Sequence, residues 1–278
     1  MNPLSTPLSA FRLLLASFLV ALAGSAAQAQ PAKEPFQPMP GQPGKDVVWV
    51  PTPYVLVEKM LDVARVTPQD YVIDLGSGDG RNVIAAAKRG ARALGVEYNP
   101  EMVALSRRAA AKEGVAGRAS FVQADMFQAD ISQATVLALF LLPDNLRRLT
   151  PKFVDLRPGT RIVLNGFAID GWDADETGRA EGDCGSWCTW HLYIVPAKVA
   201  GTWRLPEGTL RLEQKFQKVS GTFTSGGKST PITEAQLRGD EISFAVNGAR
   251  YSGRVEGAAM SGVFNGAAAG RWSAKRAS

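Results

Sequence analysis

Residues 72–103 read VIDLGSGDGRNVIAAAKRGARALGVEYNPEMV, and this stretch decides the fold. The apolar run YVIDL over 71–75 ends at a glycine-rich turn, which is typical of a strand buried on both faces of a parallel sheet. The turn GSGDG over 76–80 leads into a helix expected over 82–89. Because glycine has no side chain, a ligand can lie against the backbone where that helix begins. The stretch therefore predicts a strand, a ligand-binding turn, a helix and a second strand.

Strand and helix patterns continue to alternate on both sides of this unit. A helix is expected from Pro53, which a first helical turn tolerates, with Thr52 as its cap. Such alternation, with continuous apolar strands, calls for a parallel sheet flanked by helices. We therefore predict a doubly wound, Rossmann-like α/β domain over 47–200. Its further strands are expected at 93–98, 119–126, 134–142 and 160–167, and its further helices at 100–113 and 143–156.

The pattern changes after Gly201. Apolar residues alternate with polar ones in short runs, and dipeptides such as Asn247-Gly248 and Asn265-Gly266 separate the runs. These dipeptides supply the positive φ angles of tight hairpins. Residues 201–278 are therefore expected to form a small antiparallel β meander of about five to seven strands. The run 188–205 is expected to supply the last strands of the α/β sheet.

The first 29 residues have the pattern of a secretory signal. Arg12 precedes the apolar run LLLASFLVALAG, and SAAQA supplies the small residues of a cleavage site. We predict cleavage after Ala29 and a periplasmic or secreted location. Residues 30–46 contain five prolines and no periodic apolar pattern, so they are expected to be an extended linker.

The charged residues are unevenly distributed. Residues 30–200 contain 19 basic and 20 acidic residues, whereas residues 201–278 contain 11 and 6. The basic surplus of the second part can meet an anionic envelope surface or an acidic partner, but a solvated strand face is the more common cause of such a surplus. Lysine and arginine do not cluster as in a nucleic-acid-binding protein, so no nucleic acid is expected.

Two cysteines, Cys184 and Cys188, lie four residues apart in the stretch DCGSWC. In an oxidising compartment they can close a small disulfide loop. Structural zinc is bound by four ligands, so no metal site is expected. The single histidine, His191, is expected to be a half-buried strand residue.

Acidic residues follow three successive predicted strands. Glu97 lies 21 residues after the first glycine of the turn, where an acid that binds a ribose diol is found. A dinucleotide fingerprint needs glycine where Arg81 stands, and Asp79 places an anion where pyrophosphate would lie. Asp125 and Met126 stand where a carboxylate and an apolar side chain would meet an adenine. These features favour the cationic S-adenosylmethionine over NAD, and the predicted cofactor-binding residues are Asp74, Gly76, Ser77, Gly78, Asp79, Glu97, Asp125 and Met126.

The motifs DLGSGDGR, GVEYNP and QADMF resemble those of class I S-adenosylmethionine-dependent methyltransferases. More narrowly, WVPTP, LFLLPD and LRPGTRIV resemble the ATP synthase c-subunit lysine methyltransferase family and its prokaryotic relatives. The resemblance covers about Val47 to Phe167 and leaves the meander uncovered. It implies a seven-stranded fold, a protein lysine as methyl acceptor, and a cofactor site that includes Asp74, Gly76, Gly78, Glu97 and Asp125.

Methyl transfer is an in-line displacement, so the protein mainly positions a neutral amine and excludes water. The acceptor is expected at the carboxyl ends of the strands. The candidates to line its channel come from the segment before the first helix and from the end of the strand at 134–142; they are Thr52, Pro53, Tyr54, Leu141, Leu142 and Pro143.

Two alternatives to a protein lysine methyltransferase stay open at this point. The first is a secreted, non-catalytic protein that uses the fold to hold S-adenosylmethionine or a related nucleoside. The second is a small-molecule methyltransferase, because no residue pattern defines the acceptor. No prediction of the oligomeric state follows from the sequence.

Overall fold

The computed structural model describes residues 36–277 of the 278-residue chain. Phe36–Ser278 form one compact unit, which is described here by itself. The expected signal segment 1–29 and its cleavage site lie outside the described residues. In the described part of the chain, no helix is both long and apolar enough to cross a membrane.

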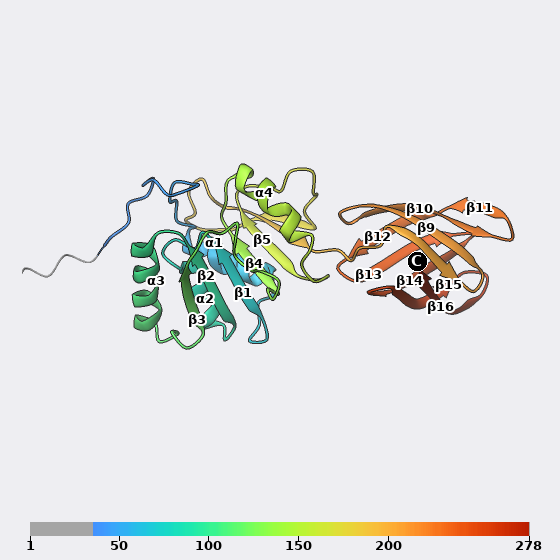
Figure 1. Ribbon diagram of the computed structural model, residues 1–278, viewed down its shortest axis with the longest axis horizontal. Coiled ribbons are helices and arrows are strands. Elements are labelled where there is room, and N and C mark those ends of the chain that lie inside the picture. The colour runs from blue at the N-terminus through green and yellow to red at the C-terminus, as the bar shows by residue number, and fades with distance from the viewer. Residues whose placement is uncertain (1–35, 278) are drawn as a thin grey trace, which may run out of the picture. The chain divides into compact units, whose positions relative to one another are not determined.

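The first half of this unit is built on a seven-stranded sheet, sheet A, with the strand order β3-β2-β1-β4-β5-β7-β6 (Figure 1). The first five strands in this order run parallel; β7 pairs antiparallel with β5, and β6 at the edge pairs antiparallel with β7. This confirms the expected doubly wound sheet. Its strands are β1 (Tyr71–Leu75), β2 (Arg92–Glu97), β3 (Ala119–Gln123), β4 (Val136–Leu139), β5 (Arg161–Asn165), β6 (Glu176–Arg179) and β7 (Thr189–Ile194).

Helices cover both faces of sheet A. Alternate residues of β1 lie in different cores: Val72 packs with α1 (Tyr54–Val63), α2 (Arg81–Lys88) and α3 (Pro100–Lys112). Ile73 packs with α4 (Pro143–Phe153) on the other face. The central strands are buried on both faces, which explains their continuous apolar sequences.

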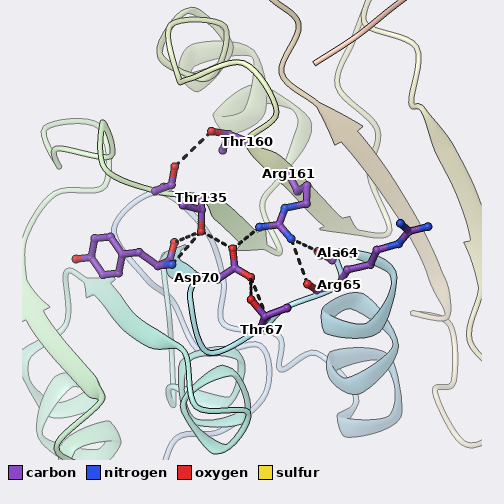
Figure 2. A network of polar contacts seen from close by, with 9 residues as sticks. Ala64, Arg65, Thr67, Asp70, Thr135, Thr160 and Arg161 are labelled. Atoms are coloured by element: carbon purple, nitrogen blue, oxygen red, sulfur yellow. Dashed lines mark hydrogen bonds and ion pairs between the residues drawn. The ribbon is translucent and has the colours of Figure 1, made fainter. Parts of the chain in front are cut away.

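The amino ends of the central strands meet in a polar network around Asp70, just before β1 (Figure 2). The Asp70 carboxylate accepts hydrogen bonds from the Thr67 amide (2.8 Å) and the Thr135 hydroxyl (2.7 Å), and it pairs with Arg161 at the start of β5. Arg161 also donates to the carbonyl of Ala64 at 2.7 Å. Burial alone would raise the pKa of Asp70, but these hydrogen bonds and the Arg161 charge lower it below the ordinary value. The network joins β1, β4 and β5 at the edge opposite their carboxyl ends.

The second half is a nine-stranded antiparallel sheet, sheet B, drawn in orange to dark red in Figure 1. Nine strands exceed the five to seven expected, partly because the short β11 has little apolar alternation. The strand order is β11-β10-β9-β8-β16-β15-β14-β13-β12. The strands are β8 (Gly201–Leu205), β9 (Gly208–Lys215), β10 (Lys218–Ser225), β11 (Lys228–Pro231), β12 (Thr233–Arg238), β13 (Glu241–Val246), β14 (Ala249–Glu256), β15 (Ala259–Asn265) and β16 (Ala269–Arg276).

The run 188–205, which was expected to supply the last strands of the α/β sheet, divides between the two sheets at the predicted boundary near residue 201. Its first part forms β7 in sheet A, but its last part forms β8, which pairs with β9 and β16 in sheet B. Trp203 on β8 is buried in the core of sheet B, and its indole N–H donates to the Val199 carbonyl at 2.8 Å. Burial of this tryptophan explains why β8 joins the second sheet.

Candidate functional site

A cavity of about 220 Å³ lies at the carboxyl ends of the parallel strands. This is the edge where ligands bind in open α/β sheets. Six of the residues predicted from the sequence line it: Gly76, Glu97, Asp125, Met126, Leu141 and Leu142. The structure therefore brings together residues that are up to 66 positions apart in the chain.

Glu97 connects the end of β2 to the glycine turn. One carboxylate oxygen accepts the backbone N–H of Gly78 and the other accepts the backbone N–H of Asn99, both at 2.9 Å. Gly78 has a φ of 55°, a conformation that residues with side chains rarely adopt. Glu97 thus holds the turn in shape while it also lines the cavity.

The two aspartates of the first motif lie outside the cavity wall. Asp74 is 3% exposed, and its carboxylate accepts a hydrogen bond from the Asn82 side chain at 3.1 Å. Burial raises the pKa of Asp74 well above the usual value, and the nearby carboxylates of Glu97 and Asp79 raise it further. Asp79 accepts a hydrogen bond from Arg81 Nε at 2.9 Å, so its charge is compensated within the chain. Direct contact of either aspartate with a ligand stays a prediction.

Ser77 lies in the same turn and is buried. Its hydroxyl has no hydrogen-bond partner among the described residues. Ser77 does not line the cavity, and its hydroxyl oxygen lies beside Gly95, where a Cβ would come within 2.5 Å of it, so contact of Ser77 with a ligand stays a prediction.

Asp125 is held in the cavity wall by contacts that its motif did not indicate. Lys45 Nζ donates to its carboxylate at 2.6 Å, and the Phe127 amide donates at 2.9 Å. These two hydrogen bonds lower the pKa of Asp125, so the carboxylate is ionised near neutral pH. The Lys45 ammonium also lies 4.7 Å from the centre of the Tyr98 ring.

Residues 42–50 also line the cavity, although residues 30–46 were expected to be a linker. The Trp49 indole packs on the glycine turn so closely that a Cβ on Gly78 would lie 2.6 Å from its Nε1. No periodic pattern marks this segment, so sequence reasoning missed Lys45 and Trp49.

Gly78→Ala is expected to weaken binding of S-adenosylhomocysteine by at least about tenfold. The new Cβ would both strain a positive φ and displace Trp49. Gly114→Ala is the matched control, because Gly114 also has a positive φ (71°) but no atom within 4 Å of the added Cβ. Isothermal titration of both variants measures the difference, and equal affinities would contradict the assignment of the turn.

The acceptor candidates divide into two groups. Leu141 and Leu142 line the cavity, whereas Thr52, Pro53, Tyr54 and Pro143 lie outside its wall. Thr52 is buried and accepts a hydrogen bond from the Asn165 side chain at 3.2 Å. Sequence reasoning missed three aromatic residues of the wall: Phe140, Phe167 and Trp187.

Cys184 and Cys188 form a disulfide, as the sequence favoured, with their Cα atoms 5.2 Å apart. His191 lies half-buried on β7, and its ring is 3.0 Å from the Thr177 hydroxyl. Within residues 36–277, no three His, Cys, Asp or Glu side chains come together in a way that could hold a metal ion.

These features fit S-adenosylmethionine. The glycine turn lets a ligand approach the backbone, Glu97 presents a carboxylate for a ribose diol, and Asp125 presents an ionised carboxylate for an amino group. The sheet order and the site together define a class I S-adenosylmethionine-dependent methyltransferase.

Comparisons with known proteins agree. The family model described as the ANTKMT methyltransferase domain matches residues 74–176. A protein-lysine N-methyltransferase of Saccharolobus islandicus is 43% identical over 152 residues, which are 54% of this chain and 94% of that relative. The chain belongs to the family of methyltransferases that includes this Saccharolobus islandicus protein. The ATP synthase c-subunit lysine N-methyltransferase of Rattus norvegicus is 39% identical over 38% of this chain, and the match spans half of the rat protein.

One solved structure is also similar. It is described as an RNA methyltransferase from Salinibacter ruber in complex with S-adenosyl-L-homocysteine. It is 41% identical with a TM-score of 0.51, and the match covers 54% of this chain and 96% of that one.

Proposed function

We propose that this protein transfers methyl groups from S-adenosylmethionine to the side-chain amines of protein lysine residues. The names of the relatives from Saccharolobus islandicus and Rattus norvegicus support a lysine acceptor. The structural observation that carries the proposal is the apolar wall of the cavity at the ends of β4 and β5. Phe140, Leu141, Leu142 and Phe167 form this wall, and such a surface suits the four methylene groups of a lysine side chain.

The two leucines of this wall favour the reactive form of the amine. When bound, S-adenosylmethionine supplies a methyl group on a positively charged sulfur. An apolar surface penalises a protonated amine, so burial of the acceptor beside Leu141 and Leu142 lowers its pKa toward the neutral, nucleophilic form. Positioning and exclusion of water therefore account for the chemistry.

An RNA acceptor is the competing function, because the similar Salinibacter ruber structure is described as an RNA methyltransferase. Residues 30–200 contain 19 basic and 20 acidic residues, so the methyltransferase part has no surplus of positive charge for a phosphate backbone. The charge balance therefore favours a protein acceptor.

Incubation of the protein with radiolabelled S-adenosylmethionine and a bacterial lysate is expected to label protein. The label should resist ribonuclease, be lost on proteolysis, and be recovered as N-methyllysine after acid hydrolysis. The Glu97→Ala variant serves as the negative control. Label that ribonuclease removes would reject the lysine proposal in favour of RNA.

We also propose that the mature protein acts outside the cytosol. The signal pattern at 1–29 and the Cys184–Cys188 disulfide support an oxidising compartment. Mass spectrometry of protein from the periplasmic fraction is expected to find Gln30 at the N-terminus and no free thiol. Protein found in the cytosolic fraction with Met1 and two thiols would contradict the proposal.

The basic surplus of sheet B supports contact with an anionic surface. The mature chain is expected to co-sediment with vesicles that contain phosphatidylglycerol but not with neutral phosphatidylcholine vesicles. The association should be lost between about 0.1 M and about 1 M salt, as the screening length falls from about 10 Å to about 3 Å. Equal binding to both vesicle types would show that charge is not the cause.

A further inference from the structure

Three aromatic rings, those of Phe140, Phe167 and Trp187, meet in the wall of the cavity. We propose that they form the subsite for the alkylammonium head of a methylated lysine, and that the Cys184–Cys188 disulfide positions Trp187 in this subsite. The inference rests on the proposed lysine acceptor, because it names the residues that would recognise it.

The topology of sheet A explains why the rings meet. Phe140 follows the last residue of β4, and Phe167 comes two residues after β5. Trp187 comes two residues before β7, which runs antiparallel to β5, so the start of β7 lies beside the end of β5. All three rings therefore lie at the carboxyl ends of the parallel strands, where the cavity is.

The rings pack against one another and form one aromatic cluster in the cavity wall. The Trp187 ring centre lies 4.9 Å from that of Phe140 and 5.8 Å from that of Phe167, with the ring planes inclined by 61° and 60°. The two phenylalanine rings are 6.4 Å apart and inclined by 25°. All three side chains are half-buried, so each keeps some accessible surface. Aromatic rings attract cations that lie within about 6 Å of the ring centre, so an ammonium group on the cavity side of this cluster can be near more than one ring.

The loop that presents Trp187 is fixed on both sides. The Trp187 amide donates to the Cys184 carbonyl at 2.9 Å, inside the five-residue loop that the disulfide closes. The Cys188 carbonyl accepts from the Ala180 amide at 2.8 Å, which ties the loop to the residue after β6. The disulfide therefore limits where the Trp187 side chain can go.

Gly166 provides the surface on which Trp187 rests. Its φ is 74°, and a Cβ at this position would lie 3.1 Å from Trp187 Cε3 and 3.8 Å from the Phe140 ring. The Gly166 amide donates to the Thr189 carbonyl at 2.9 Å, which holds the end of β5 beside the start of β7. The tryptophan is thus packed against backbone beside Phe140.

This arrangement predicts a preference for methylated ammonium groups. A primary ammonium is strongly hydrated and loses much of that hydration on entering an aromatic site, whereas a quaternary ammonium is larger and less strongly hydrated. A neutral group of the same shape gains no cation–π attraction. Trimethyllysine should therefore bind more tightly than lysine. It should also bind more tightly than a neutral isostere of the same shape.

The test uses the full chain saturated with S-adenosylhomocysteine. The probes are Nα-acetyl-Nε-trimethyllysine methylamide and its neutral isostere, in which carbon replaces Nε, and titration is followed by NMR of their methyl signals. The trimethyllysine probe is expected to bind about threefold to thirtyfold more tightly than the isostere. Trp187→Ala should remove this difference, Trp187→Phe should retain part of it, and Phe264→Ala in sheet B should leave it unchanged.

A separate variant tests the positioning role of the disulfide. Replacing both Cys184 and Cys188 by serine is expected to weaken binding of the trimethyllysine probe at least about threefold. Circular dichroism and a cooperative thermal unfolding transition show whether this variant and Trp187→Ala remain folded. Unchanged probe binding in the serine variant would overturn the positioning role of the disulfide.

The outcomes separate the two proposals. If the wild-type chain binds S-adenosylhomocysteine but does not distinguish the two probes, or if Trp187→Ala distinguishes them as the wild type does, the aromatic subsite is wrong and the lysine proposal stands. If no N-methyllysine is recovered from protein in the lysate experiment, the proposed function fails, whatever the affinities of the two probes.

Discussion

Glu97→Ala is expected to weaken binding of S-adenosylhomocysteine by about 1–3 kcal/mol, the usual cost of losing charge-assisted hydrogen bonds. In this structure the loss has two sources. The carboxylate lines the cavity where a ribose would lie, and its two oxygens accept the backbone N–H groups of Gly78 and Asn99. Isothermal titration measures the change in affinity directly.

The neighbouring Glu101 supplies the control. It is exposed in the first turn of α3, so Glu101→Ala removes the same charge nearby without touching the cavity. Glu97→Gln should resemble Glu97→Ala, because an amide has a single acceptor oxygen for two backbone donors. Wild-type affinity in Glu97→Ala would reject the ribose assignment.

Asp70→Asn is expected to lower the free energy of unfolding by about 2–3 kcal/mol at neutral pH. The Asp70 carboxylate accepts hydrogen bonds from Thr67 and Thr135 and pairs with Arg161, so an amide leaves donors without an acceptor and Arg161 without its counter-charge. Urea unfolding of both proteins measures the difference.

The pH dependence of this effect has a definite sign. The pKa of Asp70 is lowered in the folded protein, so its stabilisation is complete above the unfolded-state pKa of about 4 and is lost as the pH falls through the folded-state pKa. The difference between wild type and Asp70→Asn should therefore shrink in acid. Asp170→Asn, which changes an exposed aspartate, is the control and should unfold like the wild type at neutral pH. A difference that grows in acid would contradict the assignment.

Sequence patterns predicted the central strands of sheet A well because these strands are buried on both faces, whereas the exposed β6 was not predicted. Continuous apolar runs such as 71–75 and 160–167 are typical of strands that are buried on both faces of a parallel sheet. Sheet B was predicted less completely because short strands with one exposed face depend on their partners. β8 belongs to sheet B, where Trp203 is buried in the core. This contact is distant in sequence, so the local sequence does not show it.

The candidate site shows the same division. Residues at strand ends, such as Glu97 and Asp125, could be predicted because parallel strands bring their carboxyl ends to one edge. Phe167 ended a predicted strand and Phe140 lay two residues before the end of another, so the same signal applied to both. Lys45, Trp49 and Trp187 reach the cavity from segments without periodicity, and their positions depend on contacts distant in sequence.

The direction of β7 decides at which edge the chain leaves sheet A. Ile194, its last residue, is paired with Arg161, the first residue of β5, so the chain leaves sheet A at the amino ends of the parallel strands. The cavity lies at the carboxyl ends, so any extension after β7 begins on the side remote from the chemistry. A C-terminal segment can therefore be attached to this enzyme without its first residues passing through the cavity.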